Sequence, residues 1–258
     1  MDGLSNGAMR YFGIKTPWFT VYITQTTVTI FVATVLLITL AFFIGRNLKK
    51  RPGRFQVIVE KLVNMLYGLV EGTMGSHNMK FAPYIGTLFL SSIFCTILGM
   101  TQVLRSATAD LSVTLAWALV TTGMVWYSNI KNFGFKAWLK GFTEPIVVMM
   151  PMNIVSEIAQ PISLAFRHFG NVAGGGVLTA LIYTSLGALT SILFGWINGL
   201  LGSIPFLQIG IPAFLSIYFD LFSGFVQALV FSLLTMVYVG GANPPPPENT
   251  AETQTENQ

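Results

Sequence analysis

The feature that most limits the fold of this chain is a long apolar stretch over about residues 144–189. Beyond its first residue, Glu157 and Arg167 are its only charged side chains. About 45 residues of α-helix rise about 67 Å, whereas the hydrocarbon core of a bilayer is about 30 Å thick. We therefore expect one over-long helix that lies steeply tilted in a membrane, or that breaks at an internal proline or at the glycine run 174–176.

The composition indicates a membrane protein. Only 9% of the 258 residues are charged and 53% are hydrophobic, whereas soluble domains carry about 25% charged residues. The basic residues lie mainly in the segments that connect apolar runs, as in membrane proteins, and do not suggest a patch for nucleic acid. We therefore expect contact with the lipid bilayer and none with nucleic acid. The single cysteine, Cys95, lies within an apolar run and predicts neither a disulfide nor a metal site. We expect no cofactor.

Apolar segments predict an all-α polytopic membrane domain over residues 1–240, with about five spanning helices. The predicted spans are 21–45, 82–101, 111–130, about 144–189 and about 205–239. The last two are longer than an upright helix needs, so we expect a long tilted helical hairpin at the C-terminal end. The polar, proline-rich segment 241–258 predicts a disordered cytoplasmic tail.

Residues 54–77 predict a helix of another kind. Apolar residues recur there at helical spacing, while Glu60, Asn64 and Glu71 lie on the opposite side. This pattern is typical of an amphipathic helix at the membrane surface. A core helix of a soluble domain shows the same pattern, but the spanning segments on both sides favour the surface helix.

Basic residues predict the orientation of the spans. Several follow the first span between residues 46 and 54, and lysines recur between 131 and 140. Because cytoplasmic loops are enriched in basic residues, we expect the N-terminus outside and the C-terminus in the cytoplasm. Lys80 and Arg105 are the exceptions.

The first span is too long for the core of a cleavable signal peptide. The lack of an internal repeat counts against an inverted-repeat transporter.

Arg167 is the first candidate for a functional residue, because it is the only lysine or arginine after Lys140. An arginine at mid-bilayer costs about 2.5–3.5 kcal/mol on insertion scales. Its guanidinium keeps its proton at any working pH. Ionisable residues within membrane helices are functional in most cases.

Two predicted spans each carry a stripe of polar and small residues at steps of three and four. The stripes consist of Gln160, Ser163, Arg167, Asn171 and Gly174 on one span and Asp220, Ser223, Gly224 and Gln227 on the other. One interpretation is a buried ion pair between Arg167 and Asp220 that joins the helices. The alternative is a hydrated path or a surface for close helix approach, which the surrounding small polar residues favour.

Four segments of the chain resemble one family. The motif PISLAFRHFGN (Pro161–Asn171), followed by Ala173-Gly174, closely resembles the signature of subunit a of F-type ATP synthases. The segment FVQALVFSLLTMVYV (Phe225–Val239) resembles the same family. Supporting matches are Arg51–Glu60 and Ala109–Leu119, so the likeness runs along nearly the whole chain in the right order.

The resemblance implies an ion-translocating stator with two offset half-channels, against which a ring of c subunits turns. Each ring subunit carries a carboxyl group at mid-membrane, and b-type stalk subunits are further partners. By carry-over, Arg167 faces the ring carboxylates, Gln227 lies opposite this arginine, and Asn171 and Ser163 are small polar positions beside it. The chain itself would then carry no ATP chemistry, and its place would be the plasma membrane.

Asp220 is the acid that the resemblance places in the outer half-channel. It lies seven residues before Gln227, about 10 Å along a helix. In the family this position is often paired with an ionisable group nine residues after the arginine, where this chain has Gly176. We therefore predict Asp220 as the sole ionisable relay there, with a structural hydrogen bond as the alternative.

Toward the cytoplasm, many members of the family carry an acid where this chain has Asn153. Glu157 lies one turn closer to Arg167 and is predicted to line the cytoplasmic half-channel, with a plain interfacial acid as the alternative. His168 projects about 100° away from Arg167, which predicts packing or contact with lipid rather than a relay.

Two other functions compete with the stator. A stand-alone secondary transporter would use Arg167 to bind an anionic substrate and Asp220 to couple a proton. An intramembrane enzyme is disfavoured, because the sequence has neither a serine–histidine pair at nucleophile–base spacing nor an HExxH motif. The sequence leaves open whether the coupling ion is a proton or sodium.

Overall fold

The computed structural model describes residues 10–15, 20–46, 48–101, 104–144, 146–194 and 217–245. Within these ranges the chain is mostly helical, and five helices are long and apolar enough to cross a membrane. They are α1 (Gln25–Arg46), α3 (Ala82–Met100), α4 (Leu111–Phe133), α6 (Met150–Phe194) and α8 (Ser223–Gly241). The predicted all-α polytopic membrane fold is therefore confirmed.

A short β-hairpin precedes α1, and the apolar pattern did not predict it. Strands β1 (Arg10–Lys15) and β2 (Thr20–Thr24) pair antiparallel. Residues 21–24 were predicted as the start of the first span, but they belong to β2, and α1 begins at Gln25. β-Branched and aromatic residues suit a strand, so the segment TVYIT pairs with β1 instead of extending the helix.

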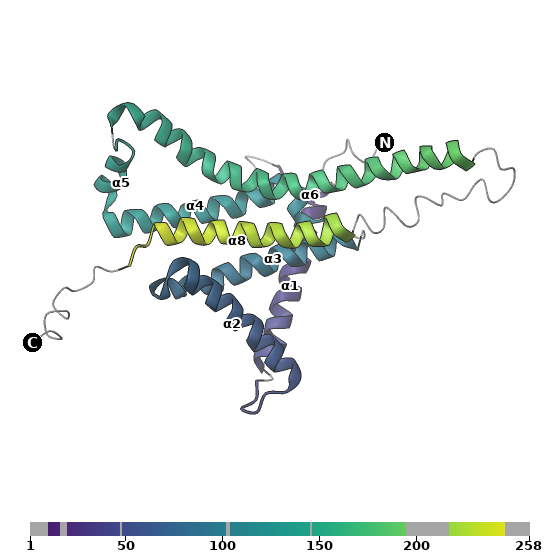
Figure 1. The fold of residues 1–258 in the computed structure, drawn as a ribbon, viewed down its shortest axis with the longest axis horizontal. Helices are drawn as coiled ribbons and strands as arrows, with labels where there is room; N and C mark the ends of the chain where they lie inside the picture. The colour runs from purple at the N-terminus through teal and green to yellow at the C-terminus, as the bar shows by residue number, and fades with distance from the viewer. Residues whose placement is uncertain are drawn as a thin grey trace, which may run out of the picture.

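Four long helices, α3, α4, α6 and α8, run alongside one another and form the core bundle (Figure 1). α6 contacts both α4 and α8, and α8 also packs along α3. One buried cluster joins all four helices through Leu88, Ala118, Leu164, Ala165 and Phe231. Because α6 is held from several sides here, the bundle determines which face of α6 points outward.

Helices α1 and α2 (Arg54–Met74) attach to one side of this bundle (Figure 1). α2 docks with its C-terminal end, where Val70 is fully buried, and most of its other side chains are exposed. The predicted surface helix 54–77 ends three residues early. Gly75, with φ of 81°, terminates α2, and the 3₁₀ helix η1 (Ser76–Phe81) follows.

α6 is one continuous helix of 45 residues. It runs through Pro161 and the glycine run 174–176 without a break, and Figure 1 shows that it bends along its length. A proline inside a helix removes one backbone hydrogen bond and favours such a bend. Of the two alternatives for the over-long stretch, a break at these residues is therefore wrong. The helix begins at Met150 rather than at 144, because η3 (Val147–Met149) is a 3₁₀ turn.

The second arm of the predicted hairpin is described from η5 (Ile217–Phe222), one turn of π-helix, through α8. Residues 205–216 of that prediction lie outside the described residues. Past α8, Asn243 is buried, and Asn78 Nδ2 donates a hydrogen bond to its carbonyl oxygen at 2.9 Å. The first residues of the predicted tail are therefore packed against the bundle, while residues 246–258 lie outside the described part.

Candidate functional site

Around Arg167, helix α6 has a buried face and an exposed face. Leu164 and His168 are buried against the other bundle helices, whereas Ser163, Arg167 and Asn171 are exposed. Successive residues of a helix differ by about 100°, so burial of His168 turns its neighbour Arg167 outward. The polar stripe predicted for this helix therefore lies largely on the surface of the chain.

His168 holds this orientation through contacts with three other helices. Its Nε2 lies 3.1 Å from Ser92 Oγ of α3, and its ring packs edge-on against Trp117 of α4 and Phe231 of α8. The side chain is 0% exposed. Of the two roles predicted for His168, packing is confirmed and contact with lipid is wrong.

The Arg167 guanidinium has no hydrogen-bond or ion-pair partner within the described part of the chain. The side chain is exposed. An exposed guanidinium does not fit the predicted alternative of a buried ion pair with Asp220, whose side chain lies outside what the structure describes. A permanent positive charge thus points away from the core of this chain, on a helix whose other exposed residues are mostly apolar or small.

The two predicted polar stripes meet between α6 and α8. Asn171 Nδ2 donates a hydrogen bond to Gln227 Oε1 at 3.4 Å, and Ser223 Oγ donates to Asn171 Oδ1 at 2.8 Å. Gln227 is only 4% exposed. The structure therefore brings Asn171 and Gln227 together about one helical turn from Arg167.

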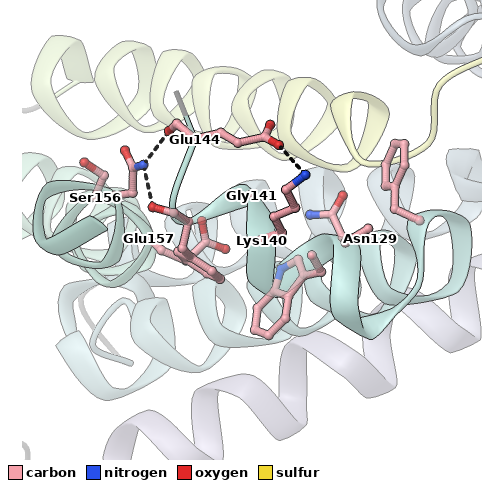
Figure 2. Close-up of a pocket in the computed structure, with 11 residues that line it drawn as sticks. Asn129, Lys140, Gly141, Glu144, Ser156 and Glu157 are labelled. Carbon is pink, nitrogen blue, oxygen red and sulfur yellow. Dashed lines mark hydrogen bonds and ion pairs between the residues drawn. The ribbon is translucent and has the colours of Figure 1, made fainter. Parts of the chain in front are cut away.

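A cavity of about 740 Å³ lies where α4, α5 (Phe135–Gly141) and the start of α6 meet (Figure 2). Its polar lining residues are Asn129, Lys140, Glu144, Asn153, Ser156 and Glu157. Trp126 Nε1 of α4 donates a hydrogen bond to Glu157 Oε1 at 2.5 Å. Glu157, the predicted acid of the cytoplasmic half-channel, therefore lies in a polar cavity with one carboxylate oxygen held by α4.

The linker between α5 and α6 forms one wall of this cavity. Asn153 Nδ2 donates to the carbonyl oxygens of Phe142 and Glu144 at 2.9 and 3.0 Å. Figure 2 shows Lys140 and Glu144 facing each other, and their charged atoms are 3.9 Å apart. Asn153, at the position where the resemblance implied an acid, thus holds the linker in place through its amide.

The sequence pattern predicted neither helix α5 nor a place for Trp126 at this cavity. The ring of Trp138 on α5 lies 6.2 Å from the ring of Trp126 and 5.1 Å from that of Phe142. Phe135, Trp138 and Phe142 recur at steps of three and four, which is the signal that could have revealed a helix. Among the described residues, no three His, Cys, Asp or Glu side chains gather as a metal site.

Comparison with known proteins finds one family along the chain. The family model described as ATP synthase A chain matches residues 27–240. The sodium ion specific ATP synthase subunit a of Propionigenium modestum is 32% identical over 85% of this chain and 74% of its own length. ATP synthase subunit a 1 of Crocosphaera subtropica is 30% identical over 86% and 88%, and ATP synthase subunit a of Anoxybacillus flavithermus is 30% identical over 81% and 86%. This protein therefore belongs to the ATP synthase A chain family.

Proposed function

We propose that the exposed face of α6 around Arg167 is the surface past which a ring of c subunits turns, and that ions cross the membrane there through two offset half-channels. As a member of its family, the chain is a multi-pass, ion-translocating membrane subunit of a rotary ATP synthase. The observation that carries the proposal is the exposed guanidinium of Arg167, which lacks a hydrogen-bond or ion-pair partner in the described part of the chain.

The proposed role of Arg167 follows from electrostatics. A carboxyl group in a membrane favours its neutral form, and a nearby positive charge favours the ionised form instead. A ring carboxyl group that reaches Arg167 would therefore release its ion. Two unit charges 4 Å apart attract by about 1 kcal/mol in bulk water and by about 4 kcal/mol at an effective dielectric constant of 20, so partial burial strengthens the effect. The same fixed cation repels ions that would pass directly from one half-channel to the other.

Small residues beside Arg167 leave room for a ring. Ser163 is exposed, and Gly170 and Gly174 have open space where a side chain would stand. Small residues allow membrane helices to approach one another closely. This face therefore supports a close approach between ring carboxyl groups and the guanidinium.

For the outer half-channel we propose Asp220 as the ion relay, with Asn171 and Gln227 as polar lining. The hydrogen bonds that join Ser223, Asn171 and Gln227 support this role, because they place polar groups between α6 and α8 beside Arg167. Gly176 has open space at the position where a side chain would stand, which leaves room for water.

For the cytoplasmic half-channel we propose Glu157 and the cavity in which it lies. Glu157 precedes Arg167 by ten residues, which is about 15 Å along a helix. That is about half the thickness of the hydrocarbon core, as a path that ends at mid-membrane requires. The cavity around Glu157 supports the proposal because it is lined by several polar side chains.

The proposal includes an orientation and two partners. The N-terminus would lie outside and the C-terminus in the cytoplasm of the plasma membrane, as the basic residues after α1 and α4 favour. The partners would be the c-ring and b-type stalk subunits. A stand-alone transporter fits less well, because a solute site would be enclosed by the chain, whereas Arg167 points outward.

The test is ATP-driven proton pumping by inverted membrane vesicles that carry the complete ATP synthase. Arg167→Ala should abolish pumping while the subunit still inserts and assembles, as immunoblots of the purified complex would report. Arg105→Ala, a matched change in the exposed segment before α4, should leave pumping intact. Normal pumping by Arg167→Ala would falsify the proposal, and transport by the purified chain without a ring would favour the stand-alone transporter.

A further inference from the structure

A groove with apolar walls lies between the C-terminal part of α1 and the start of α2, where Figure 1 shows the two helices converging away from the core bundle. Its volume is about 360 Å³. Its apolar walls are formed by Leu36, Leu40, Phe43, Ile44, Leu48 and Phe55. Phe43 is 60% exposed and Phe55 is 67% exposed, so the groove opens to the surroundings of the chain.

Five positive charges surround the junction that closes this groove. They are carried by Arg46, Lys49, Lys50, Arg51 and Arg54. All five side chains are exposed, and none forms an ion pair within the described residues. The next acid along the chain, Glu60, instead accepts a hydrogen bond from Gln56 at 2.7 Å. The junction therefore carries a concentrated positive charge that no ion pair within the described ranges neutralises.

Gln56 fixes the charged junction against the start of α2. Its Oε1 accepts a hydrogen bond from the Lys49 amide at 3.0 Å, and its Nε2 donates to the Lys49 carbonyl oxygen at 3.1 Å. Gln56 also lines the groove. The positive charges and the apolar walls are thus held together by one side chain, and Pro52 further restricts the backbone between the helices.

We propose that this junction is a binding site for one anionic phospholipid, with an acyl chain in the groove and the headgroup against the basic residues. A phospholipid is the occupant that combines a negative head with an apolar tail, and clusters of lysine and arginine at membrane boundaries attract such heads. A free phosphate ion would meet the cations but would leave the apolar walls uncovered. The site is separate from Arg167 and does not depend on the proposed ion path.

The second basic corner of the molecule, near the end of α4, differs in how its charges are arranged. Lys131 there lines a cavity of about 650 Å³ whose walls mix apolar residues such as Met124 with polar ones such as Asn132. Lys140 there already faces Glu144 at 3.9 Å, and the adjacent cavity is lined by polar residues such as Asn153 and Glu157. Lys131 and Lys140 are thus divided between two cavities of mixed lining instead of gathering at one apolar groove, and the lysines of this corner serve as a matched control.

The test is native mass spectrometry of the complete ATP synthase complex after mild delipidation and titration with phosphatidylglycerol or phosphatidylcholine. The wild type should retain phosphatidylglycerol in preference to phosphatidylcholine. The triple change Lys49→Gln, Lys50→Gln and Arg51→Gln should weaken phosphatidylglycerol retention by about tenfold or more. Leu40→Trp, which fills the groove without changing the charge, should weaken it as well.

The control is the triple change Lys131→Gln, Lys136→Gln and Lys140→Gln, which removes the same charge from the other corner and should leave retention unchanged. Equal retention of both lipids, or equal losses in the two triple variants, would overturn the proposal. So would full retention by Leu40→Trp, because the charges alone would then attract the lipid. A protein subunit found cross-linked into the groove from a photoreactive residue at Leu40 would overturn it too.

Discussion

Arg167 and His168 are neighbours on α6, yet their side chains have opposite surroundings. His168 is fully buried and contacts Ser92, Trp117 and Phe231 on three other helices. Arg167 is exposed and has no hydrogen-bond or ion-pair partner among the described residues. The first side chain is packed within the chain, and the second is exposed to whatever lies beside it.

This difference separates a polar residue that packs within the chain from one that is proposed to act at its surface. A polar group in a membrane is costly unless it is hydrogen-bonded or paired, and the buried histidine meets part of that cost through the contact between its Nε2 and Ser92, while its Nδ1 has no hydrogen-bond partner among the described residues. Arg167 has no such partner among the described residues, which is what a surface that meets the proposed ring carboxyl groups would require. The contacts on the buried face of α6 therefore fix the direction in which the exposed face points.

The largest effect is expected from Arg167→Lys. Lysine keeps a positive charge in water but loses it readily when buried, and it lacks the planar fork that suits a carboxylate. ATP-driven proton pumping by inverted vesicles should fall to background. Because the side chain is exposed in this chain, the free energy of unfolding should change by no more than about 0.5 kcal/mol. Retained pumping would show that a charge alone suffices and that arginine geometry is not needed.

His168→Ala is expected to have the opposite effect, a large change in stability. Removal of this buried ring leaves a cavity among α3, α4 and α8 and should lower the stability by about 2–4 kcal/mol. Thermal unfolding of the complex in detergent, with the yield of assembled enzyme, would measure it. Ile162→Ala, a truncation on the exposed side of the same helix, should cost about 0.5 kcal/mol or less. If both variants unfold alike, the assignment of the two faces is wrong.

A smaller effect is expected from Asn171→Leu, which breaks the link between the two stripes. A hydrogen bond contributes about 0.5–1.5 kcal/mol net, so the pumping rate should fall by about twofold to tenfold rather than vanish. Thr184→Val is the control, because the hydrogen bond that Thr184 makes in the described part of the chain goes to the Ala180 carbonyl oxygen of its own helix. A rate unchanged in Asn171→Leu would remove Gln227 and Asn171 from the proposed lining.

Much of the fold could be predicted because a membrane forces each spanning segment to satisfy its own backbone, which makes helices of apolar runs. Helical periodicity also placed Ser163, Arg167 and Asn171 on one stripe. Periodicity did not reveal whether that stripe faces inward or outward, because both faces of a membrane helix are apolar. The contacts of Leu164, Ala165 and His168 decide this, and they are made with residues far apart in the sequence.

The local elements that were missed have physical reasons. The strand β2 was hidden because its apolar residues Val21 and Ile23 lie only a few residues before the apolar run of α1, which starts at Val28. Helix α5 was hidden because Lys136 and Lys140 favoured the prediction of a loop there, although its aromatic residues recur at helical spacing. Without α5, the cavity around Glu157 could not be foreseen from the sequence.

The smallest effects separate two acids that line the same cavity. Glu157 accepts a hydrogen bond from Trp126, whereas Glu144 faces Lys140 as an exposed pair. A carboxylate in a cleft concentrates cations near it, so Glu157→Gln should slow pumping by about threefold. Exposed ion pairs contribute about 0–1 kcal/mol, so Glu144→Gln should leave the pumping rate and the stability nearly unchanged. Pumping by the two variants in parallel vesicles is the measurement. If Glu144→Gln slows pumping and Glu157→Gln does not, ions would instead enter the cavity at the exposed end beside Glu144. The exposed position of Glu144 would then matter for ion flow as much as the outward position of Arg167.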